Sequence, residues 1–196
     1  RVTLLPHRKT RSVIWTIVAD SRDGLLEKVS RHRTISVYER VQVLAWTQAR
    51  ILLRHLSIDV SEANLFQQLA SKLIYSSPAF RPAPQAIASG MRPQSALWPL
   101  SISGNRPIVT ILIRESDDIP LVEQILRAQD YWQEKRLAVD VVIINERPTS
   151  YLQDLQGALE SLVAKERISR SLELGSEHGE IFLLRADLLP PGIFEA

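Results

Sequence analysis

The most informative segment of this chain reads Leu97-Trp98-Pro99-Leu100-Ser101-Ile102-Ser103-Gly104-Asn105-Arg106-Pro107, and it runs directly into the apolar residues Ile108 to Ile113. An apolar run without alternation is typical of a parallel strand covered on both faces. A helical pattern ending near Tyr131-Trp132 and a second apolar run, Val139 to Ile144, come next. Strand, helix and strand in this order predict half of a parallel α/β unit.

The same alternation continues toward the C-terminus. Ser150-Tyr151-Leu152-Gln153 has the form of a capping box, in which a serine and a glutamine satisfy backbone donors at a helix start. Glu180 to Leu184 reads as a third short strand. Residues 96–196 are therefore predicted to form a small parallel β-α-β-α-β sheet.

The N-terminal part has a different composition. Ser12 to Ala19 is rich in β-branched and aromatic residues, which predicts a strand that forms a hairpin with Val2 to Leu5. Two strands cannot bury both of their faces, so we expect an exposed apolar face on Trp15 or its neighbours. Asp20-Ser21 is expected to cap a short helix that continues to Val29.

Two amphipathic helices are predicted next. Ser36 to Glu39 and Asp59 to Glu62 both match capping boxes, and apolar residues recur at helical spacing after each. A turn at Ser57 to Asp59 would join the helices into a helical hairpin. The proline-rich segment from Ser76 to Ser95 is predicted to be an extended linker.

Composition narrows the function classes. The chain has 196 residues, 45% of them hydrophobic, and a formal net charge of +2. Basic residues outnumber acidic ones up to His55, but they are dispersed, which favours a solvated face or an acidic protein neighbour over nucleic acid. The sequence shows no transmembrane segment or signal peptide, and it has no cysteine. The start at Arg1 without methionine suggests a piece of a longer polypeptide.

Motifs for catalysis are not found. The loop Arg114 to Asp118 follows the first buried strand but has no glycine to bring amides near a phosphate, and its carboxylates would repel one. The four histidines show no metal-ligand spacing, and the paired aspartates are expected to cap helices. We therefore predict no catalytic residue, no metal and no cofactor in this chain.

Trp98 admits two interpretations. It either anchors the linker to the core or, exposed beside hydroxyl and amide side chains, stacks against a sugar, whose C–H face is apolar. For Tyr131 and Trp132 core packing is favoured. The candidate substrate-binding residues are Trp98, Ser103, Gly104, Asn105 and Arg106.

The segment Leu97-Trp98-x-x-Ser101-Ile102-Ser103-Gly104-Asn105-Arg106-Pro107-Ile108-Val109 resembles a loop of the cyclic β-1,2-glucan synthases. It also resembles the related glycoside phosphorylases of glycoside hydrolase family ninety-four, formerly glycosyltransferase family thirty-six. Those proteins have the form Leu-Trp-x-x-Gly-Ile-Ser-Gly-Asp-Leu-Pro-Ile-Val. The similarity extends over most of the chain, through Ala45 to Ala49, Leu126 to Trp132, Leu137 to Glu146, Ser150 to Gln156 and Phe182 to Asp187.

The resemblance implies a mixed α/β architecture and a position inside a large enzyme. Residues 1–33 would be the end of an N-terminal β-sandwich, 34–95 a helical linker with a proline-rich connection, and 96–196 an α/β segment before the catalytic α/α barrel. The catalytic carboxylate would lie in that barrel, on no residue of this chain. The parent would be cytoplasmic, with its membrane-attached part upstream.

Three positions depart from the family loop. Ser101 replaces glycine, Asn105 replaces aspartate, and Arg106 replaces leucine, so the loop is expected to carry positive rather than negative charge. Two hypotheses are retained. The chain is a non-catalytic scaffold that links the sandwich and barrel of an enzyme acting on β-1,2-glucan, or it is a stand-alone glycan-binding module that uses the loop from Trp98 to Arg106. A small nucleotide-binding α/β protein is the least favoured alternative.

Overall fold

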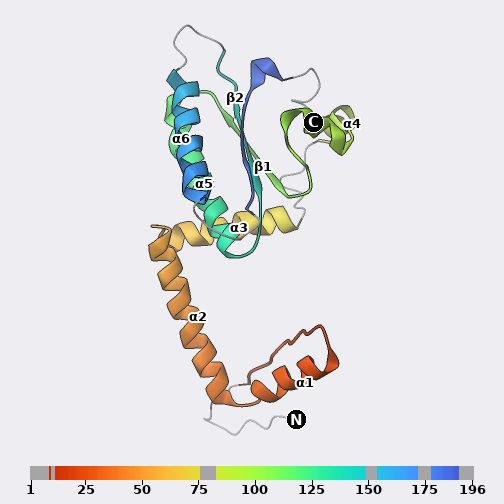
Figure 1. The fold of residues 1–196 in the computed structure, drawn as a ribbon, viewed down its shortest axis with the longest axis vertical. Coiled ribbons are helices and arrows are strands. Elements are labelled where there is room, and N and C mark those ends of the chain that lie inside the picture. The colour runs from red at the N-terminus through yellow and green to blue at the C-terminus, as the bar shows by residue number, and fades with distance from the viewer. Residues whose placement is uncertain (1–8, 10–11, 76–82, 149–153, 172–177, 190–196) are drawn as a thin grey trace. The chain divides into compact units, whose positions relative to one another are not determined.

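The computed structural model of the chain describes residues 9, 12–75, 83–148, 154–171 and 178–189 (Figure 1). The chain divides into two compact units, one up to His55 and the other from Leu56 onward. The domain boundaries expected after residues 33 and 95 concern the parent polypeptide and stay a prediction.

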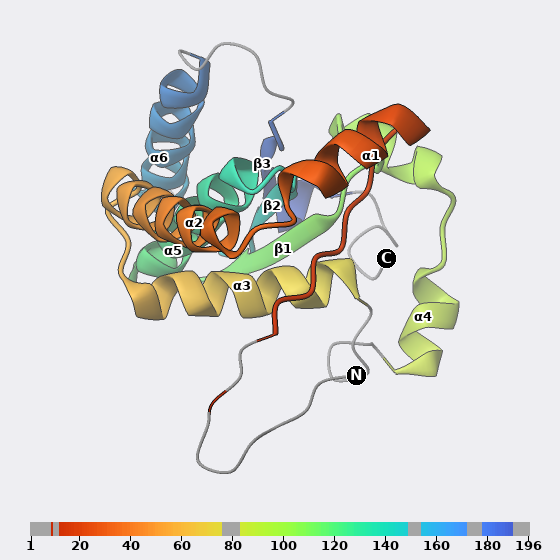
Figure 2. The ribbon, with the colours of Figure 1, turned by 90° about the horizontal axis from the view of Figure 1, so that it is seen from below.

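The second unit is built on a parallel sheet, as the sequence predicts. Its strands are β1 (Ile108–Ile113), β2 (Asp140–Asn145) and β3 (Ile181–Arg185), in the order β1-β2-β3 (Figure 2). Both pairings are parallel, and the register aligns the last residue of each strand with its neighbour's. The expected strands differ from the observed ones by at most one residue at each end, because unbroken apolar runs mark buried strands clearly.

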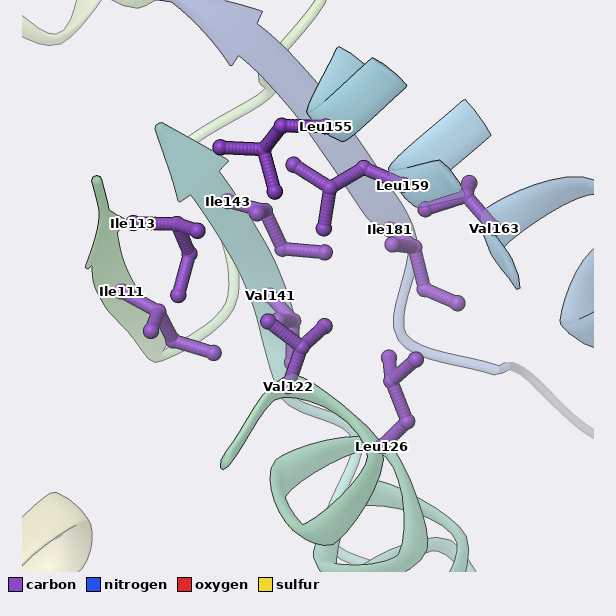
Figure 3. Packing of buried hydrophobic residues seen from close by; sticks show 10 residues of the cluster. All are labelled: Ile111, Ile113, Val122, Leu126, Val141, Ile143, Leu155, Leu159, Val163 and Ile181. Atoms are coloured by element: carbon purple, nitrogen blue, oxygen red, sulfur yellow. The ribbon is translucent and has the colours of Figure 1, made fainter. Parts of the chain in front are cut away.

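Helices cover one face of this sheet. The helices are α5 (Ile119–Glu134) and α6 (Asp154–Ser171), and their apolar sides meet the strands in one cluster (Figure 3). Each fully buried aliphatic side chain there contributes about 1.5–3 kcal/mol. The buried members are Ile111, Ile113, Val122, Leu126, Val141, Ile143, Leu155, Leu159, Val163 and Ile181.

The other face is covered by an irregular segment. Ile102 is 2% exposed and packs with Val142, Ile144 and Phe182, which point away from the helices. The segment before β1 therefore serves as the second cover that a parallel sheet needs.

A third helix supports the helical layer. α3 (Val60–Ile74) packs across α5 (Figure 1), and Phe66 is fully buried there. The indole N–H of Trp132 donates to the Phe66 carbonyl at 2.7 Å, and Gln67 Nε2 donates to the Tyr131 hydroxyl at 2.8 Å. Both aromatic residues are buried, which confirms that Tyr131 and Trp132 belong to the core.

The first unit contains α1 (Arg22–Arg31) and α2 (Ile35–His55). The Ser21 side chain accepts a hydrogen bond from the Gly24 amide, so the expected cap of α1 is confirmed. The strand expected over Ser12 to Ala19 is wrong, because these residues form no regular element. A strand requires a hydrogen-bonded neighbour, and no described residue supplies one. Its expected partner, Val2 to Leu5, lies outside the described residues, and the sandwich remnant is not shown.

Two local expectations are corrected. Helix α2 begins at Ile35, so Ser36 lies inside the helix, and its hydroxyl donates to Thr34 Oγ1 rather than capping the backbone. The segment from Ser76 to Ser95, expected to be an extended linker, contains α4 (Pro84–Gly90), and the 3-10 helix η2 (Gln94–Leu100) begins within it. Pro84 lies in the first turn of α4, where its fixed φ favours a helix. The predicted hairpin of α2 and α3 joins helices of different units and stays a prediction.

Substitution of Gly179 by alanine should destabilise the second unit by about 3 kcal/mol, because the added Cβ would overlap the backbone carbonyl of Val139. Gly157→Ala is the matched control. No heavy atom lies within 4 Å of its added Cβ, and alanine favours a helix by about 0.8–1 kcal/mol. Urea denaturation of both variants measures the difference. Equal stability of the two would contradict the close approach of Gly179 to β2.

Candidate functional site

The loop from Gln94 to Pro107 contains every substrate-binding residue that the sequence nominates. One side chain, Gln94, holds this loop together. Its Nε2 atom donates to the Ser103 carbonyl at 2.7 Å and to Asn105 Oδ1 at 2.8 Å. The backbone amide of Asn105 in turn donates to the Ser103 hydroxyl at 3.3 Å. The structure therefore brings Ser103 and Asn105 together through a residue that the sequence analysis did not nominate.

Two residues of the loop have left-handed backbone conformations. Gly104 has φ +71°, and a Cβ there would lie 2.9 Å from Gln94 Cγ, so glycine is needed for both reasons. Ser101 follows η2 with φ 64° and ψ 14°, and its amide donates to the Trp98 carbonyl at 2.9 Å. Glycine adopts this conformation after a helix without strain, whereas the serine at position 101 does not.

Trp98 lies on the outer side of the same loop. It is 64% exposed, whereas its neighbours Leu97 and Leu100 pack against the sheet. These two leucines anchor the segment, and so the interpretation of Trp98 as the anchor is not supported. The loop presents an accessible indole from a backbone that Gln94 and the sheet hold in place.

Arg106 is directed toward the sheet. Its guanidinium Nη1 lies 3.6 Å from Oδ1 of Asp140, whose side chain is only 1% exposed at the start of β2. The same carboxylate oxygen accepts a hydrogen bond of 2.9 Å from the Glu180 amide. A buried carboxylate requires such partners, because its desolvation is costly. The positive charge that the loop gains at Arg106 is therefore balanced by Asp140.

A second group of polar side chains lies at the carboxyl ends of the strands, where parallel sheets commonly bind ligands. The Asp118 carboxylate accepts hydrogen bonds of 3.1 Å from the amides of Arg114 and Glu115. These two bonds lower the pKa of Asp118. They also occupy two of the amides that a phosphate would need, which agrees with the absence of glycine from this loop.

Two ion pairs also lie at the carboxyl ends of the strands. Arg114 Nε donates to Glu146 Oε2 at 2.5 Å, and this hydrogen bond raises the pKa of the Arg114 guanidinium. Arg185 bonds to Asp187 at 2.6 Å, which raises the pKa of the Arg185 guanidinium for the same reason. Among the described residues, no group of three histidine, aspartate or glutamate side chains is placed to hold a metal ion.

Gln94 and Asp140 are not among the residues that the sequence nominates. Asp140 lies inside the apolar run from Val139 to Ile144, and a charged residue inside such a run is itself a signal of a specific partner. Gln94 carried no comparable signal. Its role depends on a loop that folds back over nine to eleven residues to meet it.

The strands and helices from β1 to β3, with this loop as cover, define a small parallel α/β segment. The chain is 38% identical over 192 residues to the cyclic β-(1,2)-glucan synthase NdvB of Rhizobium meliloti strain 1021. This match includes 97% of the chain but only 7% of the length of NdvB. The resemblance expected from the sequence is thus confirmed, and the match is consistent with a segment inside a longer polypeptide. No family model matches the chain. None of the helices in the described ranges is both long and apolar enough to span a membrane.

Replacing Ser101 by glycine should stabilise the second unit by about 0.5–1 kcal/mol, because glycine relieves the strain of an L-residue at positive φ. Ser103→Gly is the control, and it should destabilise the unit by about 1 kcal/mol because the Asn105 amide loses its acceptor. Thermal unfolding of the two variants measures whether each substitution raises or lowers the stability of the unit. A loss of stability in Ser101→Gly would show that this turn is not strained.

Proposed function

We propose that this chain is a non-catalytic connecting segment of an enzyme that synthesises or phosphorolyses β-1,2-glucan. In this proposal the segment links an N-terminal β-sandwich to a catalytic α/α barrel and supports the barrel entrance. The observation that carries the proposal is the 38% identity to a cyclic β-(1,2)-glucan synthase, which runs through nearly the whole chain. The substrate and the adjoining domains are inferred from that relationship.

The geometry of the polar residues supports a structural role. Arg106 balances a buried carboxylate, Asp118 binds backbone amides, and Arg114 is paired with Glu146. These side chains therefore hold loops and strand ends in position. Catalysis by a glycoside phosphorylase needs a carboxylic acid that is free to protonate the leaving oxygen. We place that acid on the proposed barrel.

The isolated chain should not release glucose 1-phosphate from β-1,2-glucan in the presence of phosphate. A coupled assay with a known phosphorylase as positive control measures the rate, which should equal that of the protein-free reaction. Turnover above this background, reproduced in separately purified batches, would overturn the non-catalytic assignment.

A second function, direct glycan binding, is favoured by one observation. Trp98 is 64% exposed on a loop to which the Gln94 side chain is hydrogen-bonded. An ordered aromatic ring binds the apolar face of a sugar without a large loss of conformational entropy. On this proposal the glycan contacts are Trp98, Ser103, Gly104, Asn105 and Arg106.

Titration with β-1,2-glucan at millimolar concentration should change the tryptophan fluorescence of the chain if Trp98 binds sugar. Trp98→Ala should abolish the change. Trp46→Ala is a matched control, because Trp46 is 61% exposed and lies in the other unit. The absence of any change in the unsubstituted chain, or an equal change in Trp98→Ala, would reject the binding role.

A further inference from the structure

The first unit has no hydrophobic core within its described residues. All side chains that are buried and apolar belong to Ile58 or later positions. Helices α1 and α2 contain no buried residue, although both have many apolar ones. Burial of apolar surface is the main source of folding free energy, so this unit requires apolar surface from another part of a protein.

Helix α2 shows this requirement most clearly. On a helical projection its apolar residues extend around more than half of the circumference, well beyond the approximately 100° stripe of a helix that lies on a single core. A helix with so wide an apolar face is built for cover on more than one side. Its exposed apolar side chains include Val41 at 39%, Val43 at 63%, Leu44 at 53%, Trp46 at 61% and Ile51 at 63%.

The segment before α1 extends the same surface. The side chains of residues 12–20 alternate between exposed and partly buried, as in an extended chain. Trp15 is on the inner side, with its ring 5.0 Å from that of His32 and 6.1 Å from that of Tyr38. Ile14 and Val18 are on the outer side and are 91% and 80% exposed (Figure 2 shows the segment).

The charge of the unit indicates what covers it. The sequence up to His55 has eleven lysines and arginines but only four aspartates and glutamates. On α2 the cations lie beside exposed apolar residues, and the Arg50 guanidinium stacks 4.7 Å from the Trp46 ring. Trp46, Arg50 and Arg54 border a shallow groove along the helix. A matching surface would combine apolar side chains with carboxylates.

We propose that the exposed face of α2 is an interdomain docking surface, and that its partner is an acidic, apolar face of another domain in the same longer polypeptide. This inference rests on the proposed function as a connecting segment. Two observations select that partner over a second copy of the chain. The matched segment makes up 7% of a curated relative, and the basic surface would repel an identical one. In this proposal Trp46 and Arg50 lie at the centre of the contact.

Hydrogen exchange measured by mass spectrometry tests the proposal on the 196-residue chain and on the full polypeptide that contains it. In the chain alone, amides 39–51 should exchange within about tenfold of the unstructured rate, because a helix without tertiary cover is marginal. In the full polypeptide they should exchange at least about 100-fold more slowly. Protection of β2 in both samples is the internal control for folding.

Charge reversal identifies the partner's chemistry. Arg50→Glu in the full polypeptide should lower the protection of amides 39–51 by about tenfold, whereas Arg92→Glu, the same change in the other unit, should leave it unaltered. Strong protection of α2 in the chain alone overturns the proposal, and protection that rises with chain concentration assigns the surface to a second copy instead. Equal effects of the two variants overturn the acidic partner. Each of these results is independent of whether the polypeptide acts on β-1,2-glucan.

Discussion

The complete burial of the central strand is the constraint on which the second unit depends. All six residues of β2 are buried, and a parallel strand of this kind needs cover on both faces. Helices α5 and α6 supply one cover, and the irregular segment that leads into β1 supplies the other. The loop from Leu97 to Pro107 thus covers the second face of the sheet. This explains why Leu97, Leu100 and Ile102 point inward while Trp98 remains accessible.

Buried polar groups at the start of β2 need hydrogen-bond partners, which is a second constraint on the unit. The Asp140 side chain is buried, and the Val139 carbonyl beside it accepts a hydrogen bond of 2.6 Å from Gln129. Arg170 then holds Gln129 at 2.8 Å, so that side chains from two helices support one strand end. Networks of this kind contribute conformational specificity more than stability. They favour a rigid supporting element as the role of this unit.

The two units differ in how they complete their folding. The second has its own core, whereas the described part of the first has partly exposed helices and a charge of one predominant sign. A polypeptide segment with these properties is suited to connect two larger domains. One of its units is stable by itself, and the other gains stability when it binds a neighbouring domain. The identity to a long glucan synthase agrees with such a position. The proposed docking surface would then belong to the architecture of the enzyme rather than to its chemistry.

The order of the three strands and of the two α-helices between them followed from the sequence, because unbroken apolar runs and helical periodicity are local signals. The resemblance to glucan synthases was also visible there, since it depends only on residue identities. The strand expected at Ser12 to Ala19 did not form, because β-propensity cannot supply a hydrogen-bonded partner. Only the tertiary structure showed that Arg106 faces Asp140 and that Gln94 holds the loop. These contacts join residues that are separated along the chain, and their geometry is set by the packing of the whole unit.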